Sequence, residues 1–291
     1  MKNITYSFIL LFTTTLSVSF IGCSKPEVDN RGLSETSLNA DFTVTPVSGS
    51  ANRFVLKAAD SSYILSKWDL GDGAGASIGS PTKEIFLPDA GSYTVTHHAV
   101  GKGGQAFTAT QNVNVATSDP NAGNLVQGGK FANATDWAKW TLNNTNPNGN
   151  AFWAFSAGKA TLTSNGWSGS GIYQAIPVVA GKKYKVDMVA SSTSGCVDTW
   201  FEVYVGYKTP VFGSDYNGDN GTKLRSISTW DGSGLTAFSG KISDIGSVNP
   251  SANGGIFTAT QTGTIYLGIR GGGNDMKNGI SITNVEFRGT N

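Results

Sequence analysis

The sequence predicts an all-β protein built from two successive β-sandwiches. Short apolar runs that alternate with polar residues recur from Ala40 onward, and clusters of Gly, Asp, Ser, Asn and Pro separate them. The composition agrees, because 38 glycines and 11% aromatic residues fit a chain with many strands and turns. A chain of 291 residues is long enough for two domains, and no run after the first residues is long enough for a membrane span.

Residues 1–22 have the features of a lipoprotein signal peptide. Lys2 supplies a positive start, and an apolar stretch from Phe8 to Ile21 follows it. The stretch ends in Gly22-Cys23, which resembles the bacterial lipobox, where the Cys is lipidated and becomes the new N-terminus. We therefore expect lipidation at Cys23 and a location at the outer membrane, exposed on the cell surface. An ordinary signal peptide cleaved nearby is the alternative.

Residues 23–38 predict a flexible tether, because they contain Pro, Asn, Gly, Ser and Thr without apolar periodicity. Lipidation of Cys23 would leave Cys196 as the remaining thiol, so no internal disulfide is expected. Cys is among the most buried residue types, and we expect Cys196 to be buried and inert. The net charge of +1, with 14% charged residues, gives no basic field for nucleic acid.

Two motifs define residues 39–116. The first is Trp68-Asp69-Leu70-Gly71-Asp72-Gly73, and the second is Pro88-Asp89-Ala90-Gly91-Ser92-Tyr93-Thr94-Val95-Thr96. Together they resemble the PKD domain, an immunoglobulin-like β-sandwich, although Leu70 replaces the usual Phe. We expect Trp68 and Leu70 to point inward, and Asp69 and Asp72 to accept turn hydrogen bonds rather than hold calcium. The resemblance implies a spacer or interaction module.

Residues 117–123 are a linker by composition, and residues 124–291 form one further domain. Its start, centre and end resemble the jelly-roll carbohydrate-binding modules of the family 4, 16 and 22 type. The segments that carry this resemblance are Asn124-Leu125-Val126-Gln127-Gly128-Gly129-Lys130-Phe131, Tyr173-Gln174-Ala175-Ile176, Gly181-Lys182-Lys183-Tyr184 and Ile280-Ser281-Ile282-Thr283-Asn284-Val285. The resemblance implies a polysaccharide ligand.

No cofactor is expected, although a structural calcium ion is an open alternative. Such modules often hold calcium with acidic residues where this chain has Ala132 and Thr283. A separate loop has oxygen ligands at alternate positions, namely Asp215, Asn217 and Asp219. Its twelfth position is Ser226, which lacks the carboxylate that an EF-hand requires. A polar surface loop is therefore the first interpretation.

The predicted strand from Val197 to Gly206 has one face suited to a sugar. Side chains alternate along a strand, so one set faces the core and the other faces away. The outward set combines aromatic rings, which can stack on sugar rings, with carboxylates that accept hydrogen bonds from hydroxyls. The inward set is Val197, Thr199, Phe201, Val203 and Val205, and the outward set is Asp198, Trp200, Glu202 and Tyr204.

A later strand repeats this pattern. Ile265, Leu267 and Ile269 are expected to face the core. Their outward partners are Tyr266, Gly268 and Arg270, and the glycine leaves room for a ligand.

The remaining aromatic residues divide between core and ligand. Trp137 and Trp140 follow the first strand and are expected in the core, whereas Trp153 fits either place. Trp167 lies in a Gly-rich stretch with little side-chain mass beside it, which favours ligand contact, and Trp230 is similar. The Gln174 amide can reach a sugar hydroxyl or serve a buried backbone group.

These features predict a surface lipoprotein that binds polysaccharide for a partner transporter and hydrolase, with a laminarin-like β-glucan as the first ligand. A protein-binding adhesin is the alternative. A glycoside hydrolase or lyase is less favoured, because no pair of catalytic carboxylates and no Ser-His-Asp or Cys-His pattern is visible. Arg270 and the lysines leave anionic glycans open.

Overall fold

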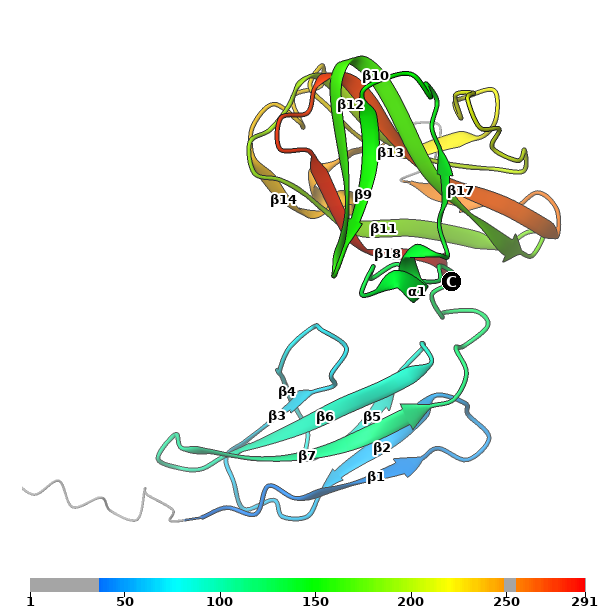
Figure 1. Cartoon of the computed structure of the whole chain (residues 1–291). Coiled ribbons are helices and arrows are strands. Elements are labelled where there is room, and N and C mark those ends of the chain that lie inside the picture. The colour runs from blue at the N-terminus through cyan, green and yellow to red at the C-terminus, as the bar shows by residue number, and fades with distance from the viewer. Residues whose placement is uncertain (1–36, 249–254, 291) are drawn as a thin grey trace, which may run out of the picture.

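The structure is a computed structural model that describes residues 37–248 and 255–290. Cys23 and the rest of the expected signal peptide lie outside the described residues. The described chain forms two β-sandwiches joined by a short connection, and helices contribute two single turns (Figure 1). The all-β prediction is therefore confirmed. Within the described ranges, no helix has the length and apolar character needed to cross a membrane.

The N-terminal sandwich packs a three-stranded sheet, ordered β1-β2-β5, against a four-stranded sheet, ordered β4-β3-β6-β7. All pairings are antiparallel. The strands are β1 (Phe42–Pro46), β2 (Arg53–Ala58), β3 (Leu65–Asp69), β4 (Ser77–Gly79), β5 (Thr82–Phe86), β6 (Gly91–Val100) and β7 (Ala106–Val115).

Trp68 lies at the centre of this sandwich, fully buried, with Leu70 packed against the same cluster. Asp69 and Asp72 each accept a backbone N–H two residues ahead, from Gly71 and Ala74, both at 2.9 Å. The motif therefore works as a core anchor followed by a self-capped turn, as predicted.

His97 is a buried neutral histidine in this core. Its ring stacks on Trp68 with centroids 4.1 Å apart. Nδ1 lies 2.8 Å from the Ala40 carbonyl oxygen, which can only accept, so Nδ1 carries the proton. Nε2 then accepts from the Ser66 hydroxyl at 2.8 Å. Burial lowers the pKa of His97 below its ordinary value of 6.5.

We expect the N-terminal sandwich to lose stability as the pH falls below about 6.5, because the unfolded chain then binds a proton at His97 that the folded chain does not. The slope should approach at most about 1.4 kcal/mol per pH unit. Urea unfolding followed by circular dichroism, at several pH values between about 7.5 and about 5.5, measures how the free energy of unfolding changes with pH. A His98→Asn variant should keep the slope, since His98 is on the opposite face. A flat profile would contradict the prediction.

The C-terminal sandwich consists of two antiparallel sheets that share one long strand. The β11 sheet holds β9, the first part of β10, β18, β11, β14 and β16, and the β12 sheet holds β8, the second part of β10, β17, β12, β13 and β15. The elements are α1 (Ala134–Trp137), β8 (Thr141–Asn143), β9 (Ala151–Ser156), β10 (Lys159–Val178), β11 (Lys183–Ser192), β12 (Val197–Gly206), β13 (Thr222–Ser228), β14 (Phe238–Lys241), α2 (Ile242–Ile245), β15 (Ser247–Val248), β16 (Ile256–Thr258), β17 (Gly263–Asp275) and β18 (Ile280–Thr290).

Strand β10 bends from one sheet into the other between Asn165 and Ser168, where its pairing with β17 shifts register. In Figure 1 this bend lies at the end of the C-terminal sandwich that is farthest from the N-terminal one. Gly166, with φ of 80°, helps the chain to make the turn.

The predicted strand parity is confirmed for the core. Phe201 and Val203 of β12 are fully buried between the sheets, together with the inward residues of β17. Val197, the first residue of β12, is exposed instead, because it lies at the strand end. Cys196 is buried as predicted, and burial raises the pKa of its thiol.

Candidate functional site

Two exposed tryptophans lie together at the bend of β10. Trp167 is 65% exposed and Trp230 is 59% exposed. Their ring centroids are 6.5 Å apart, and the ring planes differ by 24°. Two large rings left in solvent with nearly parallel planes form an apolar surface that no other part of the described chain covers.

Trp167 has a backbone conformation that is costly for its side chain. Its φ is 57°, in the left-handed region that bulky residues rarely occupy. Gly166 and Trp167 lie in the bulge between Asn165 and Ser168, where two residues of β10 oppose one residue of β17. The Trp167 side chain is exposed there. Strain of this kind persists only where the surrounding structure holds it, which directs attention to this position as functional.

Trp230 is carried by a tight turn directly after β13. Its backbone N–H donates to the Ser228 hydroxyl at 3.3 Å. The next residue, Asp231, accepts from the Ser233 backbone at 2.9 Å and from the Ser247 hydroxyl at 2.7 Å. These bonds fix the turn, so the ring is presented on a rigid support.

Trp200 extends the aromatic surface along the outer face of the β12 sheet. It pairs with Gly272 of β17, which in turn pairs with Gly169 of β10. Both glycines are in contact range of the indole: a Cβ added at Gly169 or Gly272 would lie 3.3 Å or 3.0 Å from ring atoms. The ring therefore lies over glycines of two neighbouring strands, and Trp200 stays partly exposed.

Arg270 occupies one side of Trp200. Its guanidinium carbon lies 4.4 Å from the Trp200 ring centroid and 5.1 Å from that of Tyr204, so it contacts both rings. Arg270 donates Nε at 3.1 Å and Nη2 at 2.6 Å to the Glu202 carboxylate, and it donates Nη1 to the Asp215 carboxylate. Burial opposes the charge, but these carboxylates raise the pKa of Arg270 above its ordinary value.

Tyr204 is not a solvent-facing ring, which corrects the prediction from strand parity. It lies on the outer face as expected, but it is only 6% exposed. Tyr216, from the loop of residues 207–221, packs against it edge-on with centroids 6.4 Å apart. Burial raises the pKa of the Tyr204 hydroxyl, and Glu202 adds to the effect. A loop that is distant along the sequence therefore covers this ring.

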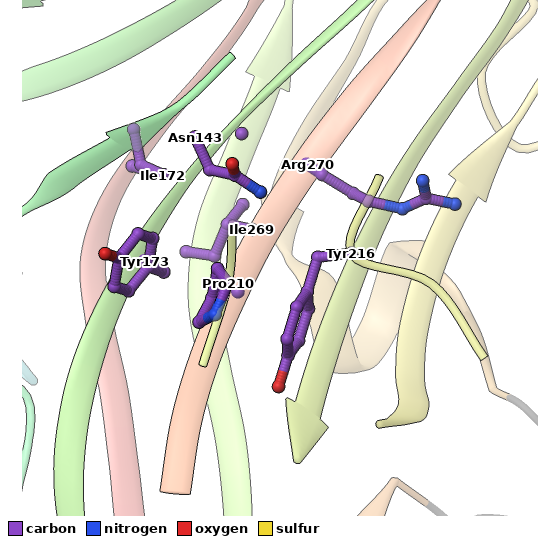
Figure 2. Close-up of a pocket in the computed structure, with 9 residues that line it drawn as sticks. Asn143, Ile172, Tyr173, Pro210, Tyr216, Ile269 and Arg270 are labelled. Carbon is purple, nitrogen blue, oxygen red and sulfur yellow. The ribbon is translucent and has the colours of Figure 1, made fainter. Parts of the chain in front are cut away.

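The same loop fills the space that Gly268 was expected to leave for a ligand. A Cβ at Gly268 would lie 3.0 Å from the Tyr216 ring. The loop is held across the sheet as far as β8, because the Asn143 amide donates to the Ser214 carbonyl at 3.3 Å and the Gly213 N–H to Asn144 at 3.0 Å. Figure 2 shows the small pocket that results, with Pro210 between Tyr173 and Tyr216.

The other outward residues are divided. Asp198 is exposed, with φ of 48°, at the start of β12 near the bend. Tyr266 is half-buried and contacts Tyr173, with its hydroxyl accepting from Thr209 at 2.9 Å. Tyr266 thus lies on the far side of the loop from the tryptophan pair, and the structure does not bring it to the same site.

Gln174 and Trp153 serve the protein interior rather than a ligand. The Gln174 amide accepts from the Gln127 N–H at 2.7 Å and donates to two backbone carbonyls. Trp153 packs in the core near Phe201, with centroids 6.4 Å apart. The expected core positions of Trp137 and Trp140 are confirmed, since both pack on that core.

Two of the candidate calcium ligands in the loop, Asp215 and Asn217, have partners within the protein. The Asp215 carboxylate pairs with Arg270, and Asn217 Oδ1 accepts from the Asp219 N–H at 3.0 Å. Within residues 37–248 and 255–290, no group of three or more His, Cys, Asp or Glu side chains is placed to hold a metal ion. The Asn217 side chain forms an Asx turn, as expected of a polar surface loop.

The glycines under Trp200 and the packing of Tyr216 over Tyr204 were not predicted from the sequence. The run Gly271-Gly272-Gly273 was a signal for the first feature, because a strand with three successive glycines offers no side chains. No local signal marks Tyr216 as a cover, since its contacts are with residues ten or more positions away.

No protein-family model and no curated protein matches this chain. Among solved structures, one from work on "the promiscuous specificity of the carbohydrate-binding modules from the beta-sandwich super family" is 16% identical, covers 86% of this chain and 97% of that chain, and has a TM-score of 0.32. A CBM4 structure is 14% identical, covers 57% of this chain and 99% of its own, with a TM-score of 0.35. The structure of TmCBM61 in complex with β-1,4-galactotriose is 12% identical, covers 57% of this chain and 99% of that chain, and has a TM-score of 0.32. All three TM-scores are low, so these likenesses carry no argument about the ligand of this chain.

Proposed function

We propose that this chain binds polysaccharide at the aromatic surface formed by Trp167, Trp230 and the open part of Trp200. The observation that carries the proposal is the pair of exposed, nearly parallel indoles held on a strained bulge and a hydrogen-bonded turn. Flat apolar rings on rigid supports suit the C–H faces of sugar rings. Asp198 lies at the same end of the sheet and can accept hydrogen bonds from hydroxyls.

The expected affinity is modest. A ring that covers on the order of 60 Å² of apolar surface contributes about 1.5 kcal/mol. Two or three rings and a few hydrogen bonds, less the cost of ordering the glycan, give about 4 to 8 kcal/mol, which corresponds to millimolar to micromolar binding. Many copies on one polymer would raise the avidity.

An uncharged glycan fits this surface better than an anionic one. Arg270, which the sequence offered as a partner for anionic sugars, is committed to Glu202 and Asp215 and contacts two rings. Its side chain is 11% exposed. The first ligand to test is therefore a neutral β-glucan such as laminarin.

We also infer binding without catalysis. Hydrolysis requires one carboxyl group that can give up a proton and a second that acts across the bond. Glu202, on the same face of β12 as Trp200, has both carboxylate oxygens paired with cations, one with Arg270 and one with Lys223 at 3.0 Å, so it is not free to act on a glycosidic bond. A lipid anchor at Cys23, an outer-membrane location and the role of residues 39–116 as a PKD-type spacer complete the proposal.

Affinity electrophoresis of the chain from Ser24 onward, which keeps every described residue, tests the function. Gels would contain laminarin, a mixed-linkage β-glucan, xylan or alginate. We expect retardation by a neutral β-glucan and its loss in Trp230→Ala. Phe152→Ala is the matched control, because Phe152 is an exposed aromatic on β9 of the other sheet and its loss should change nothing. If no polysaccharide retards the protein, the adhesin interpretation gains and this proposal fails.

A further inference from the structure

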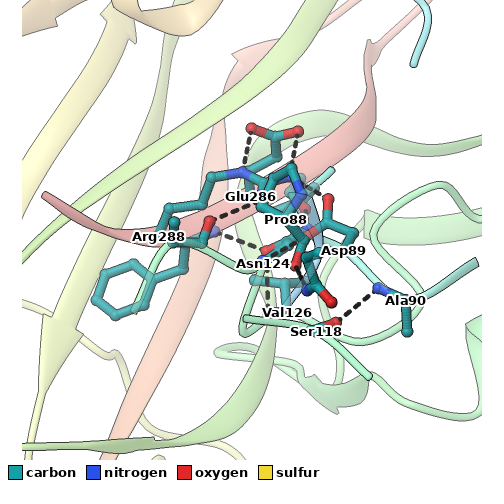
Figure 3. A network of polar contacts seen from close by, with 12 residues as sticks. Pro88, Asp89, Ala90, Ser118, Asn124, Val126, Glu286 and Arg288 are labelled. Atoms are coloured by element: carbon teal, nitrogen blue, oxygen red, sulfur yellow. Dashed lines mark hydrogen bonds and ion pairs between the residues drawn. The ribbon is translucent and has the colours of Figure 1, made fainter. Parts of the chain in front are cut away.

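A single arginine connects the two sandwiches. Arg288, near the end of β18, donates Nη1 to Asp89 Oδ1 at 2.8 Å and Nη2 to Asp89 Oδ2 at 2.6 Å. Asp89 belongs to the turn between β5 and β6 of the N-terminal sandwich. Figure 3 shows this fork-shaped contact together with its neighbours. Two parallel charge-assisted bonds fix direction as well as distance.

Arg288 is held from its own domain and from the linker at the same time. Its Nε donates to Glu286 Oε2 at 3.0 Å and its Nη2 to Oε1 at 3.1 Å. Its Nη1 donates to the Ala122 carbonyl at 3.0 Å. All five N–H groups of the guanidinium therefore have acceptors, and the side chain has no freedom to follow a moving partner.

Asp89 receives a third bond, from the Asn124 backbone N–H at 2.7 Å. The Asn124 side chain in turn donates to the Val285 carbonyl and accepts from the Phe287 N–H, both at 3.0 Å. Burial opposes the charge, but the bonds from Arg288 and Asn124 hold the pKa of Asp89 below its ordinary value. The carboxylate thus stays charged at neutral pH.

The connecting segment is tied down along its length. The Asp119 N–H donates to the Pro88 carbonyl at 2.7 Å, and the Ala90 N–H donates to the Ser118 hydroxyl at 3.0 Å. The Asn52 amide donates to the Thr117 carbonyl at 2.9 Å. A linker with its backbone bound to the N-terminal turns cannot act as a slack hinge.

We infer that the Asp89–Arg288 contact locks the two sandwiches into one rigid body, so that the N-terminal sandwich sets the direction in which the tryptophan surface points. Ile280 of β18 pairs with Leu162 of β10, which lies close to the bend. Arg288 lies eight positions further along β18. At about 3.3 Å per residue, the lock and the bend are roughly 25 Å apart, at opposite ends of the domain. Figure 1 shows the described chain starting at the other end of the molecule from the bend.

The test is a distance measurement by pulsed electron paramagnetic resonance on the chain from Ser24 onward. Spin labels go on Thr108→Cys in β7 and Thr163→Cys in β10, both exposed positions, while Cys196 is buried and stays unlabelled. We expect one narrow distance distribution for the parent chain and at least a twofold broader one for Asp89→Ala or Arg288→Ala.

Arg53→Ala is the matched control, because Arg53 pairs with Glu84 inside the N-terminal sandwich and its loss should leave the distribution narrow. If Arg288→Ala unfolds the C-terminal sandwich, Asp89→Ala decides, since Asp89 lies in a turn of the other domain. A broad distribution in the parent chain, or an unchanged one in Asp89→Ala, would overturn the inference. Neither outcome depends on glycan binding, so the proposed function is tested separately.

Discussion

Replacing Trp167 with glycine will weaken glycan binding at least tenfold while leaving the C-terminal sandwich as stable as the parent or more stable. Trp167 has φ of 57°, which glycine adopts without steric cost and a bulky residue does not. Relief of that strain is worth on the order of 1 kcal/mol. Loss of one stacking ring removes about 1.5 kcal/mol of binding, which is roughly tenfold.

Two measurements check this result together. Affinity electrophoresis gives the change in binding, and urea unfolding followed by tryptophan fluorescence gives the change in stability. The signal reports mainly the C-terminal sandwich, because Trp68 is the one tryptophan of seven that lies in the N-terminal sandwich. Trp167→Ala should lose the same binding without the gain in stability, since alanine keeps a Cβ. A fall in stability of about 2 kcal/mol in Trp167→Gly would instead make the ring a packing residue.

Replacing Arg270 with methionine will destabilise the C-terminal sandwich by about 3 kcal/mol. The side chains of Arg270 and Glu202 are 11% and 13% exposed, so removing the guanidinium leaves a carboxylate with little solvent. Lys223 keeps one contact with Glu202 at 3.0 Å, which holds the loss at the lower end of the usual range. The loop bearing Asp215 also loses its ion pair.

Urea unfolding of Arg270→Met measures the loss, and Arg53→Met is the control. Arg53 pairs with Glu84 at 3.0 Å, but both side chains are about half exposed, so that substitution should cost less than about 1 kcal/mol. A double variant, Arg270→Met with Glu202→Leu, should recover part of the stability, because the unpaired carboxylate is gone. If the two substitutions lowered the free energy of unfolding equally, the buried ion pairs of Arg270 would contribute no more than an exposed ion pair, and the prediction would be wrong.

The fold was predictable where the pattern is local. Alternation along 199–205 and 265–270 gave the correct inward residues, because a strand with one buried face cannot shift its register by one residue. Val197, at the strand end, was predicted inward but is exposed. The turn after Trp68 was also readable, since Asp69 and Asp72 bond to backbone two residues away. The exposure of Trp167 was indicated by composition, because a large ring between glycines has little to pack against.

The site was less predictable where long-range contacts decide. Parity correctly turned Tyr204 away from the core, but alternation cannot tell a face open to water from one covered by a loop. Arg270 illustrates the same limit, because its sequence neighbours give no hint that two carboxylates from other segments neutralise it. The Gln174 side-chain amide is hydrogen-bonded to the backbone of Gln127, 47 positions away, and this contact was not predictable from the local sequence.

The sharing of β10 between the two sheets has a mechanical consequence. Under the proposed function, a polymer held at the bend would pull on a backbone whose two arms run back into separate antiparallel ladders. One arm pairs with β9 and β18, and the other pairs with β8 and β17. The force would be shared by both arms and directed along the strands. Many interstrand hydrogen bonds would then have to break at the same time, and not one after another.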